Sequence, residues 1–240
     1  MKGIILSGGS GTRLMPLTKV TSKQLLPVYD KPMIFYPLET LVKAGIKEIL
    51  IIVSPEHSEQ YEQLLEKGEE FGVNITYKIQ PKPEGLAQAF IIAKDFIGHD
   101  SVCMILGDNI FEDDFSAIIK EFRSGGHIFV KKVPDPQRFG VVEFDEDHRA
   151  IKIIEKPKDS VSEHAITGLY IFDNRVIEAA SSVKPSARGE LEITDVQLWY
   201  LEKGELKIDI VSGEWIDAGT FDSLYRAGEL AYKKARQQKP

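Results

Sequence analysis

The feature that most constrains this chain is a short apolar run that ends directly in a glycine-rich loop. Residues 2–14 read KGIILSGGSGTRL, and residues 3–6 have the apolar character of a buried strand in a parallel sheet. Glycine lacks a Cβ and can adopt positive φ, so the loop can bring backbone N–H groups close to a ligand. Because Arg13 adds a planar, permanently charged donor, the loop predicts a binding site for phosphate groups.

Two better-known phosphate-binding loops do not fit this stretch. The dinucleotide-binding pattern G-x-G-x-x-G fails because its third glycine would fall on Leu14, or its second on Ser10, depending on where it begins. The ATP-binding P-loop requires Gly-Lys followed by Ser or Thr, whereas Gly11 is followed by Thr12. The loop itself therefore leaves two interpretations open, a phosphate site of another kind or a tight turn after an edge strand.

Apolar runs and helical segments alternate along the first half of the chain, and strands become more frequent in the second half. We expect strands at 3–6, 49–53, 75–79, 101–106, 128–132, 140–144, 151–155, 165–172 and 206–211, and helices at 32–45, 57–70, 86–96, 176–180, 191–203 and 221–236. This order predicts an α/β fold, a three-layer α/β/α sandwich with a central, mostly parallel, Rossmann-like sheet.

Composition narrows the function classes. The 240 residues carry a net charge of −7 and show no basic stripe, which argues against a nucleic-acid partner. No apolar run is long enough to cross a bilayer, and the N-terminus lacks a signal-peptide profile, so we expect a cytoplasmic protein without a membrane partner. Cys103 is the single cysteine, which excludes an intrachain disulfide.

A second motif follows the glycine loop and makes the pattern specific. Residues 22–27 read SKQLLP, and together with GGSGTRL at 8–14 they resemble the sugar nucleotidyltransferase family, within it the glucose-1-phosphate thymidylyltransferases. The resemblance extends over essentially the whole chain. It implies the nucleotide-diphospho-sugar transferase fold in a single domain, residues 1–240, with 1–116 mainly binding nucleotide and 117–240 mainly binding sugar phosphate. It also implies Mg²⁺ as cofactor and a homo-oligomer, a homotetramer in many relatives.

The implied reaction transfers a thymidylyl group from dTTP to α-D-glucose 1-phosphate, giving dTDP-glucose and pyrophosphate. Two alternatives stay open on this fold: a UTP-dependent uridylyltransferase acting on the same sugar phosphate, and a non-catalytic regulatory subunit that binds nucleotide sugars. The regulatory subunit would have lost some of the arginine, lysine and acidic residues of the motifs, and all of them are present.

Two aspartates are candidate metal ligands. Asp108 in LGD (106–108) ends an expected buried strand, at the edge where open α/β sheets bind ligands. From the residues alone, a helix N-cap explains Asp108 equally well, and turn chemistry explains Asp217 in EWIDAGT (214–220). The resemblance implies instead that Asp108 and Asp217 together hold Mg²⁺, a cation that favours carboxylate, phosphate and water oxygens.

The remaining site residues follow from the resemblance of QPKPEGLAQA (80–89) to the base-recognition segment and of EKP (155–157) to the sugar-phosphate site. The implied catalytic residues are Arg13, Lys23, Asp108 and Lys156. The implied nucleotide-binding residues are Leu6, Gly8, Gly9, Gly11, Thr12, Arg13, Gln24, Gln80 and Gly85. The implied sugar-phosphate-binding residues are Gly140, Glu155, Lys156, Tyr170, Arg188 and Trp215. One departure is Phe139, which stands where many relatives carry tyrosine.

Overall fold

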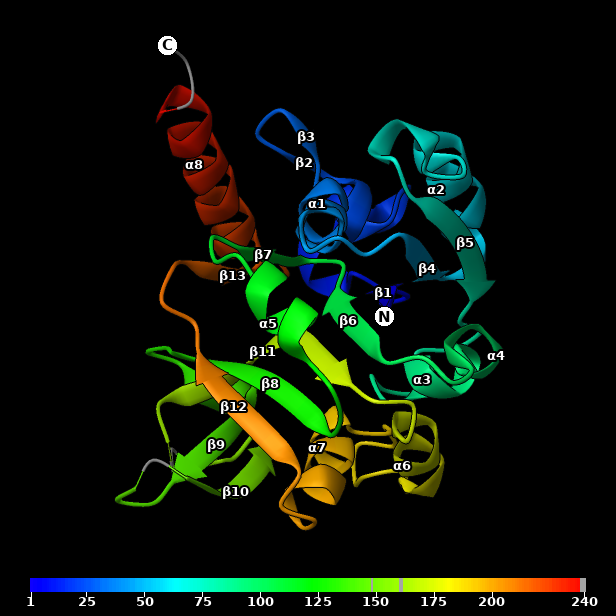
Figure 1. Ribbon diagram of the computed structural model, residues 1–240. Helices are drawn as coiled ribbons and strands as arrows, with labels where there is room; N and C mark the ends of the chain where they lie inside the picture. Colours follow the sequence, from blue (N-terminus) through cyan, green and yellow to red (C-terminus); the bar gives the residue numbers. More distant parts are fainter. Residues whose placement is uncertain (148, 160–161, 238–240) are drawn as a thin grey trace.

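This computed structural model describes residues 1–147, 149–159 and 162–237. Over these residues, a nine-stranded sheet runs through the whole molecule, in the order β10-β9-β11-β6-β1-β4-β5, with β8 beside β11 and β12 beside β8 (Figure 1). Its strands are β1 (Lys2–Ser7), β4 (Glu48–Val53), β5 (Asn74–Ile79), β6 (Val102–Leu106), β8 (Gly126–Lys132), β9 (Gly140–Phe144), β10 (Ala150–Glu155), β11 (His164–Phe172) and β12 (Leu206–Ile210).

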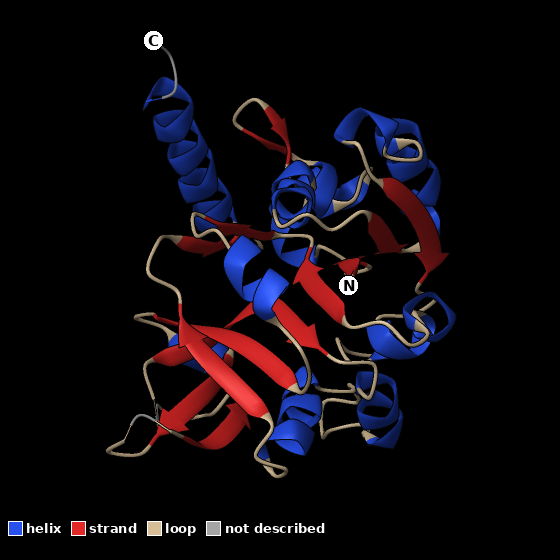
Figure 2. Ribbon diagram, in the orientation of Figure 1, coloured by secondary structure: helices blue, strands red, loops and turns tan. Residues whose placement is uncertain are grey.

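Two small antiparallel pairs stand outside this sheet. They are β2 (Pro27–Val28) with β3 (Lys31–Pro32), and β7 (Asn109–Phe111) with β13 (Trp215–Asp217). The helices are α1 (Phe35–Lys43), α2 (Ser58–Leu65), α3 (Gln88–Ile92), α4 (Lys94–Ile97), α5 (Ser116–Glu121), α6 (Val176–Ser182), α7 (Ile193–Leu201) and α8 (Phe221–Gln237). Helices pack against both faces of the sheet (Figure 2), so the expected three-layer α/β sandwich is confirmed.

The order of strand pairing joins the two halves of the chain without a linker. Strands β6, β1, β4 and β5 are parallel, as the alternation of strands and helices predicts. Strand β11 then pairs antiparallel with β8 along one edge, and with β6 and, at Ala165, with β9 along the other. Strands from the first and the second half of the sequence therefore belong to one sheet.

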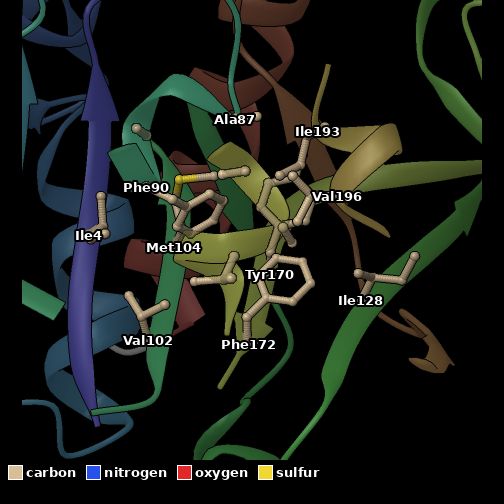
Figure 3. Close-up of a cluster of buried hydrophobic side chains, with 14 of the residues drawn as sticks. Ile4, Ala87, Phe90, Val102, Met104, Ile128, Tyr170, Phe172, Ile193 and Val196 are labelled. Atoms are coloured by element: carbon tan, nitrogen blue, oxygen red, sulfur yellow. The ribbon is translucent and has the colours of Figure 1, made fainter. Parts of the chain in front are cut away.

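Side-chain alternation along β1 explains why helices cover both faces. Ile4 points to a core cluster that includes Phe90 of α3 and Val196 of α7 (Figure 3), whereas Ile5 points to a cluster with Leu38 of α1 and Tyr61 of α2. Successive strand residues face opposite sides, and full burial of such side chains contributes ~1.5–3 kcal/mol each. A strand that is apolar at every position is thus the signature of a sheet buried on both faces.

Four helices are shorter than the sequence predicts, and one of them is the expected 191–203 helix, which is α7 at Ile193–Leu201. The 57–70 segment leaves the α-helix after Leu65, because Glu66 adopts φ 46°. The 86–96 segment is interrupted at Ala93 and forms α3 and α4. The 32–45 helix begins only at Phe35. Helix α8 matches its prediction within one residue, and reciprocal hydrogen bonds between Thr220 and Ser223 cap its N-terminus.

Candidate active site

A cleft of about 550 Å³ lies at the carboxyl ends of β1 and β6 and extends over β9, β10 and β11. Parallel strands open their ligand sites at this edge because the loops that follow them diverge there. The cleft brings together most of the residues that the sequence nominates. They are Leu6, Gly8, Gly9, Arg13, Lys23, Gln24, Gln80, Gly85, Asp108, Gly140, Glu155, Lys156, Tyr170, Arg188, Trp215 and Asp217.

Two nominated residues, Gly11 and Thr12, are not among the residues that line the cleft. Gly11 has φ 63°, and its carbonyl accepts a hydrogen bond from the Thr18 hydroxyl at 2.8 Å. Thr12 begins a 3₁₀ turn that ends at Leu14. The structure therefore gives this part of the loop an internal role: it turns the chain so that Arg13 faces the cleft.

A pair of buried amides lies in the cleft beside the glycine loop. Gln80 and Gln24 are only 3% and 2% exposed, and each has a fixed partner. The Nε2 of Gln80 donates to the Oε1 of Gln88 at 2.6 Å, and the Oε1 of Gln24 accepts from the Ser22 hydroxyl at 2.6 Å. A Cβ built on Gly8 would lie 1.9 Å from the Oε1 of Gln80, so only glycine fits beside this amide.

Gly85 is required for a reason that the sequence does not reveal. We expect it to let the backbone approach a base, but the closest obstacle to a side chain here is Leu191. A Cβ on Gly85, which has φ 110°, would lie 2.3 Å from the Leu191 carbonyl oxygen. The neighbouring Ala87 N–H donates to that carbonyl at 3.1 Å, and the Leu191 N–H donates to the Glu84 carbonyl at 2.7 Å. These contacts hold the loop that contains Gly85 against the loop before α7.

The two candidate metal ligands are neighbours through the β7–β13 pair. Asp108 lies between β6 and β7, and its carbonyl accepts a hydrogen bond from the N–H of Ala218 at 2.9 Å. The Lys23 ammonium forms an ion pair with the Asp108 carboxylate. Burial raises the pKa of Asp217, and the charge of Asp108 raises it further. Burial opposes ionisation of Asp108 too, yet Lys23 and the hydrogen bond from Asn109 hold its pKa below the usual value.

The end of the cleft at β10 is built around Glu155, the last residue of that strand. Its carboxylate lies 3.6 Å from the Lys156 ammonium and 3.4 Å from the Arg188 guanidinium, and it accepts a hydrogen bond from the Thr194 hydroxyl at 3.2 Å. Burial is the main reason that the pKa of Glu155 is raised. A Cβ on Gly140, the partner of Glu155 in the β9–β10 ladder, would lie 2.8 Å from Thr194, so a glycine is needed there.

Lys156 has a strained backbone. It adopts φ 40°, although it is not a glycine and precedes Pro157, a position that normally favours extended conformations. Its N–H donates to the Phe139 carbonyl at 3.1 Å, which holds this turn in place. Strain of ~1–3 kcal/mol persists only where the surrounding structure enforces it, and it is common at binding sites. The turn directs an exposed cation into the cleft.

Comparison with known proteins identifies the family to which this chain belongs. A family model described as nucleotidyl transferase matches residues 2–234. The chain belongs to the nucleotidyl transferase family. It is 54% identical, over 96% of its own length and 82% of the relative's, to a glucose-1-phosphate thymidylyltransferase of Neisseria meningitidis. It is 52% identical, with the same coverage, to a glucose-1-phosphate thymidylyltransferase of Mycolicibacterium smegmatis.

Solved structures place this nucleotidyltransferase in the same fold. A Bacillus anthracis protein crystallised with sucrose is 47% identical and superposes with a TM-score of 0.92, covering 96% of this chain and 95% of that one. A UDP-glucose pyrophosphorylase bound to UDP-glucose superposes with a TM-score of 0.83 at 24% identity, covering 97% of this chain and 98% of that one. At that identity the second likeness concerns the fold alone.

Asn109 is the residue that the sequence analysis most clearly missed in this nucleotidyltransferase. Its Nδ2 donates to Asp108, while its Oδ1 accepts from the Trp215 indole at 2.6 Å and from the Gly168 N–H at 3.1 Å. It therefore joins the carboxylate end of the cleft to β11 and β13. Phe139 packs its ring 5.1 Å from that of Trp215, so the position expected to lack a hydroxyl contributes packing instead.

The carboxylate pair fits the magnesium ion implied by the sequence. Within the described part of the chain, no cluster of three or more His, Cys, Asp or Glu side chains could form a complete metal cage. Mg²⁺ does not need one, because it retains water and takes phosphate oxygens as further ligands. Burial and the nearby charge of Asp108 both raise the pKa of Asp217, so a cation held by these two carboxylates would offset an unfavourable charge.

Proposed function

We propose that this chain transfers a thymidylyl group from dTTP to α-D-glucose 1-phosphate, giving dTDP-glucose and pyrophosphate. The observation that carries this function is the arrangement of charge in one cleft. Arg13, Lys23 and the two aspartates line the cleft where we assign the nucleotide, and Lys156 and Arg188 line it where we assign the sugar phosphate. Identity of about half over nearly the whole chain with thymidylyltransferases supports the same reaction.

The chemistry requires charge control more than proton transfer. A phosphate oxygen of the sugar phosphate attacks the α-phosphorus of dTTP, a new P–O bond forms, and the bond to the β-phosphate oxygen breaks. The nucleophile is already an anion, so no general base is needed. The protein must bring two polyanions together and hold the attacking oxygen in line with the leaving pyrophosphate.

Each end of the cleft supplies part of that control in our proposal. Arg13 binds the triphosphate with its planar guanidinium, and the amides of the glycine loop contribute further donors. Lys156 and Arg188 bind the sugar phosphate, and Glu155 accepts hydrogen bonds from sugar hydroxyls. Mg²⁺, when bound by Asp108 and Asp217, neutralises charge on the phosphates. Lys23, which pairs with Asp108, also donates to the triphosphate.

The proposal also covers contacts with the base, the cellular location and the oligomeric state. Gln24 and Gln80 contact the base through their buried amides, and Leu6 lies beneath it. Tyr170 and Trp215 form the wall behind the sugar. No described helix is both long and apolar enough to cross a membrane. We propose a cytoplasmic location, where dTTP is made, and a homo-oligomeric state with residues 1–116 and 117–240 as nucleotide and sugar-phosphate halves.

A panel of nucleoside triphosphates and sugar 1-phosphates tests this function. With Mg²⁺ and glucose 1-phosphate, dTTP is expected to release pyrophosphate and yield dTDP-glucose, detected by chromatography. UTP differs from dTTP by a methyl and a hydroxyl, and a single methyl discriminates by only ~1–3 kcal/mol, so UTP is expected to react more slowly. A higher kcat/KM for UTP would identify a uridylyltransferase, and no product with any pair would contradict the proposal.

A further inference from the structure

A chain of three hydrogen-bonding side chains with a defined direction reaches the cleft at Gln80. Gln80 Nε2 donates to Gln88 Oε1 at 2.6 Å, and Gln88 Nε2 donates to the Glu84 carboxylate at 2.7 Å. The backbone N–H of Glu84 also donates to Gln88 Oε1, at 3.3 Å. An ionised carboxylate can only accept, and a backbone N–H can only donate. Glu84 therefore orients both ends of the Gln88 amide.

The orientation of the Gln88 amide fixes the orientation of the Gln80 amide. Because Gln88 presents its carbonyl oxygen, Gln80 must turn its own NH₂ toward Gln88 and leave its Oε1 on the opposite side. That oxygen lies against Gly8, and both Gln80 and Gly8 line the cleft. Gln80 is 3% exposed, so an acceptor here has few alternatives to the ligand. A buried acceptor facing another acceptor is left unsatisfied, which weakens binding.

We propose that Glu84 and Gln88 are positioning residues that set base selectivity by holding the Gln80 amide oxygen toward the bound base. This inference rests on the proposed function, since it concerns the base of the nucleotide substrate. Thymine and uracil carry a hydrogen on ring nitrogen N3 and can donate to that oxygen. Cytosine has an unprotonated N3 at this place, so two lone pairs would face each other.

The second buried amide lacks such an anchor. Gln24 accepts from Ser22, which is in turn 2.8 Å from the Tyr61 hydroxyl, and hydroxyl groups can donate or accept. A network of this kind can reverse its direction when a different base binds. Discrimination between an N3–H base and cytosine is therefore assigned to Gln80 and its two supporting residues.

The experiment compares dUTP with dCTP, which differ only at N3 and the group on C4. Affinity for each nucleotide is measured by calorimetry, and kcat/KM by pyrophosphate release with glucose 1-phosphate and Mg²⁺. The variants are Gln88→Met, which keeps length but removes the polar head, and Gln88→Lys, which can only donate. The double variant Glu84→Gln/Gln88→Glu keeps an acceptor for Gln80 and a donor–acceptor pair between positions 84 and 88, and Gln63→Met on the exposed face of α2 is the matched control.

Gln88→Met is expected to lower the dUTP-to-dCTP preference by about 10-fold, because the freed Gln80 amide can rotate to suit either base. Gln88→Lys is expected to lower it further, since lysine reverses the required direction. Glu84→Gln/Gln88→Glu and Gln63→Met are expected to keep the wild-type preference. A purely structural role for Gln88 would weaken both nucleotides equally and leave the preference unchanged.

An unchanged preference in Gln88→Met and Gln88→Lys would overturn the inference, as would an equal loss in Glu84→Gln/Gln88→Glu. The binding arm separates this result from the proposed function. A wild-type protein that binds dUTP over dCTP but releases no pyrophosphate contradicts the function and leaves the positioning role supported.

Discussion

Asn109 stands opposite Asp217 in the β7–β13 ladder, and this register sets the carboxylate of the preceding residue, Asp108, close enough to Asp217 to perturb its ionisation. The pKa of Asp108 is lowered, whereas the pKa of Asp217 is raised. Lys23 compensates the charge of Asp108, whereas Asp217 bears the cost of burial and of a like charge. A cation bound by the two carboxylates would therefore offset their unfavourable charge. The predictions for Asp108 and Asp217 depend on this difference between the two pKa values.

Asp108→Asn is expected to remain folded and to lose most turnover in Mg²⁺, because it removes one charge and one ligand from the proposed metal site. Steady-state pyrophosphate release measures the loss, and circular dichroism checks the fold. Asp222→Asn, at an exposed position in the first turn of α8, is the control and should retain turnover. Near-normal turnover in Asp108→Asn would mean that this acid has only a structural role.

The stability of the metal-free protein should respond differently to Asp108→Asn and Asp217→Asn. Asp108→Asn leaves the buried Lys23 ammonium without its carboxylate, and removing one partner of such a pair costs ~3 kcal/mol. Asp217→Asn removes a carboxylate whose folded-state pKa is raised, so its ionised form opposes folding at neutral pH. This variant should therefore match or exceed wild-type stability, by ~1 kcal/mol per unit of pKa shift.

The pH dependence of this difference follows from the same sign. The folded protein binds the Asp217 proton more tightly than the unfolded chain does, so its contribution to stability falls as pH rises through the window above the ordinary aspartate pKa of ~3.9. Thermal unfolding in EDTA at neutral pH and below that window measures it. An advantage of Asp217→Asn that persists at the lower pH would refute the explanation.

Arg13→Ala is expected to lower kcat and kcat/KM together. Negative charge moves toward the leaving pyrophosphate as the bond breaks, so a guanidinium on the triphosphate binds the transition state more strongly than the ground state. By analogy with oxyanion-hole donors the loss is ~3–4 kcal/mol, or about 10²–10³ in rate. Kinetics with each substrate varied in turn test this, with Arg226→Ala on α8 as control. A change confined to the KM for glucose 1-phosphate would reverse the assignment.

Lys156→Ala should instead act mainly on substrate binding. The sugar phosphate carries its charge in both the ground state and the transition state, so loss of this cation raises the KM for glucose 1-phosphate with a smaller fall in kcat. Lys152→Ala, an exposed lysine on β10, serves as control. If kcat falls as far in Lys156→Ala as in Arg13→Ala, both cations act on the same phosphate.

A stability prediction concerns Gly228, inside helix α8. A Cβ built there meets nothing within 4 Å, and its φ is not positive. Gly228→Ala should therefore stabilise the protein by ~0.5–1 kcal/mol, the usual gain from replacing glycine in a helix interior. Thermal unfolding is expected to shift upward by about 1–4 °C. Turnover should not change, and a lower unfolding temperature would show that α8 needs a flexible point here.

The parts of the site that sequence predicts best are those whose signal is local. Residues 3–6 and the glycine loop that follows announce a strand and a binding turn within a dozen residues, and β1 with Arg13 in the cleft agrees with both. Gly85 lies in the cleft, but its need for glycine comes from Leu191, more than a hundred residues away. Contacts of that range leave no periodic trace in the chain.

Other features were hidden because local rules predict the opposite. A residue before proline normally reads as extended, so nothing at Lys156 announces φ 40°. The three-residue strands β7 and β13 are too short for a recognisable alternation, and Asn109 gains its role only when they pair. Glu84 and Gln88, by contrast, stand four residues apart, a spacing at which side chains meet in a helical turn.

Strand β11 determines how this cleft can exchange its contents. Its backbone is hydrogen-bonded to β6 on one side and to β8 on the other, so a continuous ladder crosses the cleft where a two-domain enzyme would have a hinge. Admission and release of substrates must then come from the surrounding loops, at 8–25, 81–87 and 185–192. Exchanging these loops among relatives would alter substrate range while the sheet that aligns the reacting groups stays as it is.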